Sequence, residues 1–145
     1  MSKLRSLIRG AVAGASATVP MSAVMAGGER LHMLGEPPPR KITRAGVRAV
    51  NGSATGAEVD ALSWASHFAF GAVMGAAYGL LVGDRRPSIA SGILFGTAVW
   101  AVSYAGWVPA LGIMPSPSRD RPLRPEVMLV AHWAYGASLA RRLQG

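Results

Sequence analysis

The stretch Ala61–Gly83, ALSWASHFAFGAVMGAAYGLLVG, decides the fold, because none of its 23 residues is charged. A helix rises about 1.5 Å per residue, so this stretch would be about 35 Å long, enough to cross the roughly 30 Å hydrocarbon core of a bilayer. Glycine recurs at every fourth residue from Gly71 to Gly83, which lines one helix face with small residues. These features predict a transmembrane helix that packs closely against another helix.

Three further runs without charge flank this stretch: Gly10–Gly28, Pro87–Ser118 and Val127–Ala140, with 19, 32 and 14 residues. The first two are long enough to span a bilayer. The third covers only about 21 Å and needs snorkelling of the arginines that follow it, or local thinning of the bilayer. We therefore predict one all-α integral membrane domain over residues 1–145, a bundle of four transmembrane helices in two hairpins. The expected helices are 7–28, 61–83, 88–109 and 126–142.

The composition agrees with this fold class, because 50% of the residues are hydrophobic and only 15% are charged. The absence of cysteine excludes disulfides, zinc–thiolate sites, cysteine-ligated iron–sulfur clusters and a cysteine nucleophile. The Lys and Arg residues lie between the apolar runs, so we expect the net charge of +8 to meet lipid headgroups and not nucleic acid. Two alternatives stay open: the runs are buried helices of a soluble domain, or the first run is a signal peptide.

The connections between the predicted helices differ in length. Residues 29–60 form a long polar loop, in which a short amphipathic helix over 40–50 can lie on the membrane surface. Its basic face would hold anionic lipid headgroups through Arg40, Lys41, Arg44 and Arg48, and the alternative is a solvated loop. The second connection, Asp84–Pro87, is so short that the helices on either side of it are expected to form a hairpin.

The two halves of the sequence share a pattern that indicates a parallel internal repeat. A Gly-x-x-x-Gly pair opens the first and third predicted helices, and a block of His, aromatic, Gly and Ala residues recurs at His67–Ala72 and His132–Ala137. The alternative is chance similarity between helices rich in alanine and glycine. Small residues at this spacing let helix backbones approach each other in a membrane. The residues predicted to pack helices together are Gly10, Gly14, Gly71, Gly75, Gly79, Gly83, Gly92, Gly96 and Gly136.

His67 and His132 are the best candidates for chemistry, because an ionisable residue inside a membrane bundle is a functional hypothesis by default. At equal depth on parallel helices they could ligate one haem b iron, with Gly71 and Gly136 leaving room for the macrocycle. A proton relay and a quinone-head-group site are further alternatives. The simplest alternative is that each ring only hydrogen-bonds a neighbouring group, and our first expectation is no cofactor and no metal. No catalytic motif is found, so we expect no enzyme.

The order of these blocks resembles the YagU-like group of small bacterial inner-membrane proteins. The residues that carry the resemblance are Gly10–Met21, Pro37–Pro39, His67–Gly79, Trp107–Gly112 and His132–Gly136. The resemblance implies a multi-pass inner-membrane protein with a loose link to acid tolerance, and it supplies no catalytic residues. Basic residues close to the ends of the predicted spans favour a cytoplasmic location for both termini.

Together these features predict a non-enzymatic integral membrane protein that acts as a structural or accessory subunit or associates with itself. Its partners would be the lipid bilayer and other membrane subunits or further copies of the chain. One alternative is an electron-transfer subunit that binds haem or quinone through His67 and His132. A second alternative is a small transporter or an acid- and ion-stress protein.

Overall fold

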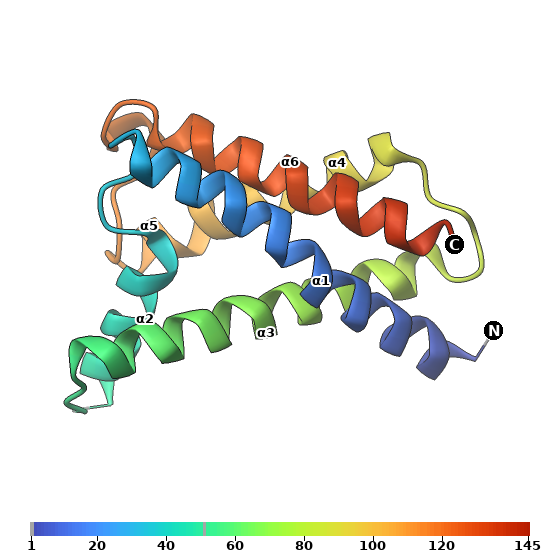
Figure 1. The fold of residues 1–145 in the computed structure, drawn as a ribbon, viewed down its shortest axis with the longest axis horizontal. Coiled ribbons are helices and arrows are strands. Elements are labelled where there is room, and N and C mark those ends of the chain that lie inside the picture. The colour runs from blue at the N-terminus through green and yellow to red at the C-terminus, as the bar shows by residue number, and fades with distance from the viewer. Residues whose placement is uncertain (1, 51) are drawn as a thin grey trace.

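The computed structural model describes residues 2–50 and 52–145, and their regular structure is helical (Figure 1). The elements are α1 (Lys3–Arg30), α2 (Pro38–Ala49), α3 (Gly56–Val82), α4 (Ile89–Val102), the π-helix η1 (Ser103–Trp107), the short α5 (Val108–Ala110), the 3-10 turn η2 (Pro117–Arg119) and α6 (Arg124–Leu143). The predicted all-α class is therefore confirmed for this part of the chain.

Polar side chains cap the first turns of α1 and α3, so both helices begin several residues before the predicted start. The Ser2 hydroxyl accepts a hydrogen bond from the backbone N–H of Arg5 at 3.4 Å. At α3, the Glu58 carboxylate accepts from the backbone N–H of Thr55 at 2.7 Å, and the Thr55 hydroxyl accepts from that of Glu58 at 3.3 Å. These caps satisfy N–H groups that have no partner within the helix.

α1 and α3 cross with their backbones in contact, and glycines form the crossing. A Cβ atom on Gly14 would lie 2.7 Å from the Cα of Gly75, and one on Gly79 would lie 2.9 Å from the Cα of Gly10, closer than real Cβ atoms approach. Gly83 was predicted to pack helices together, and it takes no part in this crossing. It ends α3 with a φ of 60°, which favours glycine, and has no neighbour within 4 Å of its Cβ position.

α4 and α6 form a second pair through glycines. A Cβ atom on Gly92 would lie 2.6 Å from the Cβ of Ala140, and one on Gly136 would lie 3.2 Å from the backbone nitrogen of Gly96. In both pairs, a helix with Gly-x-x-x-Gly therefore meets a helix with His-x-x-x-Gly.

The alignment of α3 along α1 differs from that of α6 along α4, so the predicted repeat is not a repeat of one packing geometry. Gly10 and Gly92 hold equivalent places in the sequence pattern. Gly10 contacts residues eight and twelve positions after the histidine of α3, whereas Gly92 contacts residues four and eight positions after the histidine of α6. α6 is thus displaced along α4 by about one turn, roughly 6 Å, relative to the way α3 lies along α1. The halves share a packing motif but are not copies of one geometry.

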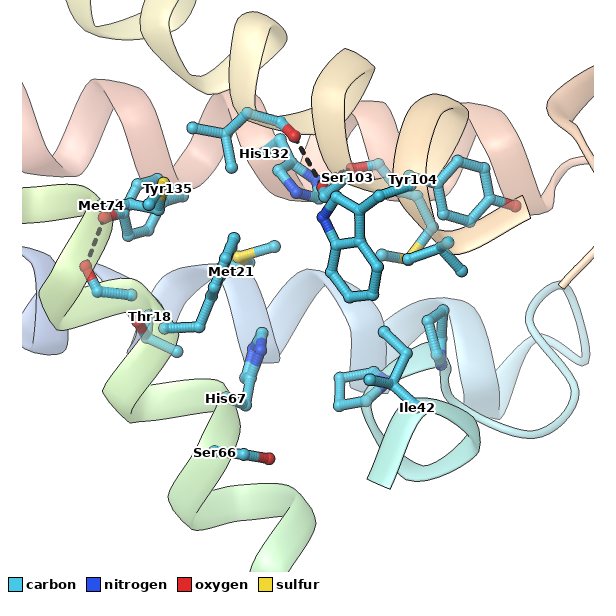
Figure 2. A pocket seen from close by; sticks show the side chains of 18 residues that line it. Thr18, Met21, Ile42, Ser66, His67, Met74, Ser103, Tyr104, His132 and Tyr135 are labelled. Atoms are coloured by element: carbon cyan, nitrogen blue, oxygen red, sulfur yellow. Dashed lines mark hydrogen bonds between the residues drawn. The ribbon is translucent and has the colours of Figure 1, made fainter. Parts of the chain in front are cut away.

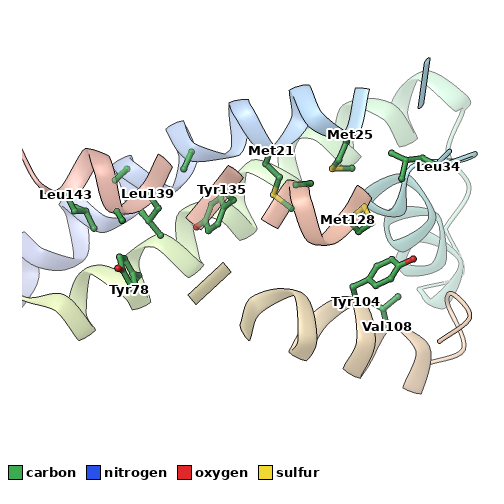
Figure 3. Packing of buried hydrophobic residues seen from close by; sticks show 14 of the residues in the cluster. Met21, Met25, Leu34, Tyr78, Tyr104, Val108, Met128, Tyr135, Leu139 and Leu143 are labelled. Carbon is green, nitrogen blue, oxygen red and sulfur yellow. The ribbon is translucent and has the colours of Figure 1, made fainter. Parts of the chain in front are cut away.

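The core lies where α1 packs against α6, and it joins the two pairs. Met21 and Met25 of α1 belong to one buried cluster with Met128, Tyr135 and Leu139 of α6 (Figure 3). α1 contacts both α3 and α6, so it holds the bundle together.

α3 and α4 follow each other across a short turn, but their backbones do not form a close pair. They meet through side chains: the rings of Tyr78 and Phe95 have centroids 4.8 Å apart, and the Tyr78 hydroxyl lies 2.8 Å from that of Ser91. The expectation that the short connection makes these two helices a packed hairpin is therefore wrong. The small residues of α3 face α1 and those of α4 face α6, so neither helix offers the other a small-residue face.

Three segments are long and apolar enough to cross a membrane: α1, α3 and Ile89–Ala110, which joins α4, η1 and α5. Large apolar side chains on their outer faces are exposed, among them Val12 (64%), Val73 (59%) and Leu94 (71%). Soluble monomers rarely expose large contiguous apolar surfaces, so such faces indicate contact with lipid or another protein.

Four transmembrane helices were predicted, and three segments are long and apolar enough to span a membrane, because α6, predicted as the shortest span, does not meet the same criterion. Its first turn contains Arg124 and Glu126, and its last turn contains Arg141 and Arg142. Nine of its 20 residues are buried, against nine of 28 in α1 and six of 27 in α3, so α6 presents a smaller share of its surface to the outside.

Candidate functional site

A cavity of about 220 Å³ lies inside the bundle, between α1, α3, the segment α4–η1–α5, α6 and the first residues of α2 (Figure 2). The cavity lies where α3 and α4 separate from each other, because α3 packs against α1 and α4 packs against α6. Its wall is mostly apolar. His67 and His132 both line it, so the structure brings the two predicted site residues to one cavity.

His132 is buried on α6, with 4% of its surface exposed, and its Nδ1 donates to the carbonyl oxygen of Met128 at 2.7 Å. A carbonyl can only accept, so Nδ1 carries the proton, and Nε2 of the neutral ring is an acceptor. The backbone of His132 also packs against Gly96 of α4. The helix thus fixes both the position and the tautomer of this ring.

His67 lies on α3, and its ring points into the cavity from the side opposite to His132 (Figure 2). Its Nε2 is buried and has no hydrogen-bond partner among the described residues. A buried polar atom without a partner costs about 1–3 kcal/mol. A ligand that hydrogen-bonds this atom would recover that cost.

Tyr135 connects α6 to α3 at the edge of the cavity. Its hydroxyl donates to the carbonyl oxygen of Gly71 at 2.6 Å (Figure 2). Gly71 in turn packs against Thr18 of α1, whose hydroxyl donates to the carbonyl oxygen of Gly14 at 3.0 Å. This wall of the cavity is therefore held by three helices.

The glycines that follow the two histidines do not open space for a macrocycle. A Cβ atom on Gly71 would collide with the Thr18 hydroxyl, and one on Gly136 would lie 2.7 Å from the carbonyl carbon of Gly92, so helix contacts occupy both positions. An engineered cavity of about 150 Å³ binds one benzene ring. The cavity of about 220 Å³ suits one substituted ring, and a haem would require it to widen. Haem ligation by the two histidines stays a prediction that includes this widening.

The π-helix η1 forms the wall of the cavity opposite α1 and α3. Ser103, Tyr104 and Trp107 of η1 line the cavity, and the Ser103 hydroxyl donates to the carbonyl oxygen of Val99 at 2.6 Å. Pro109 lies two residues after the end of η1, and a proline ring clashes with the carbonyl four residues earlier in an α-helix. The wider π turn before Pro109 relieves this clash, and single π turns occur frequently at functional sites.

α2 covers one side of the cavity with Pro38, Pro39 and Ile42. The mouth lies beside it, between α3 and η1, because Ser66, Phe70 and Trp107 line the cavity and are themselves exposed. The Ser66 hydroxyl is 3.3 Å from that of Thr43, which connects the rim to α2.

The predicted amphipathic helix is present as α2, and two of its cations pair within the chain. Arg40 lies 2.8 Å from the carboxylate of Asp60, and Arg44 lies 2.7 Å from that of Glu36. These pairs position α2 over the cavity and reduce its free positive charge. Headgroup binding by Arg40, Lys41, Arg44 and Arg48 stays a prediction.

A buried ion pair beside the cavity was not found from the sequence. Asp120 and Arg124 lie 2.8 Å apart, with side chains 2% and 5% exposed. The Tyr104 hydroxyl donates to the second oxygen of Asp120, and Arg124 Nε donates to the carbonyl oxygen of Leu34 at 2.7 Å. Tyr104 belongs to η1 and Leu34 to the turn after α1, and both side chains are part of the buried cluster (Figure 3). The only sequence signal is the i,i+4 spacing of the pair, which is common on protein surfaces.

Acidic side chains are not part of the cavity wall. None of its eighteen lining residues is Asp, Glu, Lys or Arg. Among residues 2–50 and 52–145, no group of three or more His, Asp or Glu side chains is placed to hold a metal ion.

The fold and the site together define a small all-helical bundle with three segments able to cross a membrane, built around an apolar cavity that two histidines line. The chain belongs to the DUF6789 family, a family of unknown function whose sequence pattern matches residues 4–144. No curated protein and no solved structure matches the chain. The resemblance to the YagU-like group is not confirmed by these comparisons and stays a prediction.

Proposed function

We propose that the chain is an integral membrane protein that takes up a small molecule with one ring from the bilayer and binds it in the cavity between α3 and α4. The observation that carries the proposal is the buried Nε2 of His67, which has no hydrogen-bond partner among the described residues and belongs to a side chain that lines a mostly apolar cavity. Ligand sites typically combine an apolar wall with a few polar groups that fix orientation. His67 and His132 are suited to be those groups.

The lining supports a neutral ligand. A charged ligand would lose its hydration without gaining a counter-ion, because no lining side chain is acidic or is a lysine or arginine. The cavity volume, about 220 Å³, supports a single substituted ring.

The position of the mouth supports entry from the bilayer. Phe70 is at the mouth and lies at the middle of α3, with about 20 Å of helix on either side. If α3 crosses the membrane, the mouth opens into hydrocarbon and not into water. An apolar tail on the ligand could then stay in the bilayer while the ring enters the cavity.

α6 crosses the membrane with the other helices in this proposal, as a fourth helix inside the bundle. Arg9 near the start of α1 donates to the carbonyl oxygen of Gly145 at 3.0 Å, so the two ends of the chain lie together. Both termini would therefore lie on the same side, which we assign to the cytoplasm of a bacterium because of the basic residues at both ends. The outer faces of α1, α3 and α4 would meet lipid, other membrane subunits or further copies of the chain.

Binding of ring compounds to the full chain in lipid nanodiscs tests this function. We expect saturable 1:1 binding of methylhydroquinone by isothermal titration, and Ser66→Phe, which narrows the mouth, should weaken it at least tenfold. Methylhydroquinone with a decyl tail should bind no more weakly than the tail-free compound. Absence of saturable binding would contradict the proposed function. Loss of binding on adding the tail would contradict entry from the bilayer.

A further inference from the structure

We infer that the cavity selects a ring that carries a hydroxyl group, so that the ligand is a phenol or a hydroquinone head group. This inference rests on the proposed function and names the chemical class of its ligand. The hydrogen-bonding state of His132 carries it.

His132 can only accept a hydrogen bond from a ligand in the cavity. Its Nδ1–H is used by the Met128 carbonyl at 2.7 Å, which leaves only the lone pair of Nε2 for the cavity. Rotation of the ring about its last torsion would break this bond. The ring therefore offers a ligand an acceptor and no donor, so the complementary ligand group is an O–H or N–H.

The hydroxyl groups of the cavity wall do not compete for the same nitrogen. The hydroxyls that line the cavity have acceptors elsewhere for their protons: Thr18 donates to Gly14, Ser103 to Val99, Tyr104 to Asp120 and Tyr135 to Gly71, and Ser66 has an acceptor in the carbonyl oxygen of Ser63 at 3.1 Å. The other N–H donor of the wall besides the histidines is the indole of Trp107, a residue that is 37% exposed at the mouth. None of the described side chains donates a hydrogen bond to His132 Nε2, so this acceptor is available to a donor on the ligand.

His67 provides a second polar group on the other side of the cavity. Its ring faces the cavity from the other side, and its unpaired Nε2 supplies a second polar point (Figure 2). Met21 lies between the two histidines in Figure 2, and most of the other side chains that line the cavity are apolar. Two polar points separated by an apolar wall match a ring with polar substituents at opposite ends. A hydroquinone can donate to His132 with one hydroxyl and hydrogen-bond His67 with the other.

Charged and fully etherified rings fit this arrangement poorly. A carboxylate or an ammonium group would find no counter-ion in the wall. A methyl ether has no O–H and would leave the His132 acceptor unpaired. Sites built to hydrogen-bond a hydroxyl discriminate strongly against analogues without it, for this reason.

The test compares two rings of the same skeleton on the full chain in nanodiscs under reducing conditions. We expect methylhydroquinone to bind at least tenfold more tightly than its dimethyl ether, 1,4-dimethoxy-2-methylbenzene. His132→Phe should remove this preference and leave the ether's affinity within about threefold. His32→Asn, on the exposed turn after α1 at a φ of 58°, is the matched control and should retain the preference.

The outcomes separate this inference from the proposed function. Equal affinities for the two rings would overturn the hydroxyl requirement while leaving ring binding intact, and no binding of either ring would overturn the proposed function itself. A preference that survives in His132→Phe would overturn the assignment to His132.

A second measurement on the unmodified chain does not depend on the folding of a variant. The nitrogen NMR resonance of His132 Nε2 should be that of an unprotonated acceptor and should shift when methylhydroquinone is added. A protonated Nε2, or a resonance that the ligand leaves unchanged, would overturn the inference.

Discussion

Gly14 of α1 and Gly75 of α3 meet backbone to backbone: a Cβ atom on Gly14 would lie 2.7 Å from the Cα of Gly75, and one on Gly75 would lie 2.5 Å from the Cα of Gly14. Neither residue can gain a side chain unless the helices separate. The same contact fixes α3 where it borders the cavity, so the geometry of the site depends on it.

Gly75→Ala should therefore destabilise the bundle, by about 1–3 kcal/mol as for overpacked cores. The matched control is Gly27→Ala in α1, because a Cβ atom there would have no neighbour within 4 Å. Alanine is the better helix former, so this control should be neutral or stabilising by up to about 1 kcal/mol. Unfolding of both variants in detergent, followed by circular dichroism, gives the comparison. Equal stability of the two would show that the crossing is not as close as described.

The Asp120–Arg124 pair should contribute more to stability than an exposed pair of the same chemistry. Asp120→Asn leaves the buried guanidinium without its counter-ion, and breaking such pairs costs about 3–5 kcal/mol. Glu36→Gln breaks the more exposed pair with Arg44 and should cost less than about 1 kcal/mol. Thermal unfolding of the two variants in the same detergent measures the difference, and similar losses would contradict the buried role of Asp120.

We expect the His67 side chain to reduce the free energy of unfolding and to contribute to binding of the ring compound. His67→Phe replaces a buried nitrogen without a partner by carbon, so the free energy of unfolding should stay the same or rise by about 1 kcal/mol. Ring binding should weaken at least tenfold at the same time. Destabilisation together with unchanged binding would indicate that His67 serves packing and not a ligand.

The chain contains no cysteine, so single cysteines can report which faces lie in lipid. Val73 at the middle of α3 and Val50 after α2 are both exposed, by 59% and 77%. In intact membranes a charged maleimide should label Val50→Cys and leave Val73→Cys unlabelled until detergent is added. Val130→Cys, on the exposed side of α6, should behave like Val73→Cys if α6 crosses within the bundle. Rapid labelling of Val73→Cys would contradict membrane insertion of α3.

The apolar helices could be predicted because a charge-free run of about 20 residues matches the thickness of the hydrocarbon core and is rare in soluble domains. The glycine spacing likewise indicated close packing, and Gly14 and Gly75 show why it was informative. Gly83 lies in the same row of glycines, but it ends the helix, and spacing alone does not distinguish the two roles.

Partner choice between helices was harder to predict. A short connection indicated a packed hairpin of α3 and α4, but side-chain size and not loop length decided which helices pair. The cavity forms because α3 and α4 pack against other helices and leave space between them. His67 and His132 were predicted as site residues from their place in apolar segments, and the structure places both at one cavity. The burial of Asp120 and Arg124 was not predicted, because nothing in a loop sequence indicates burial.

Photolabelling in native membranes tests the central claim, binding of a ring inside the bundle, most directly. A phenol that carries a small diazirine is activated on the full chain, and the modified residues are located by mass spectrometry. We expect the label on cavity residues such as Met21, Met74 and His67, and we expect excess methylhydroquinone to prevent it. Labelling confined to outward-facing residues such as Leu81 and Leu94, unaffected by the competitor, would contradict the account.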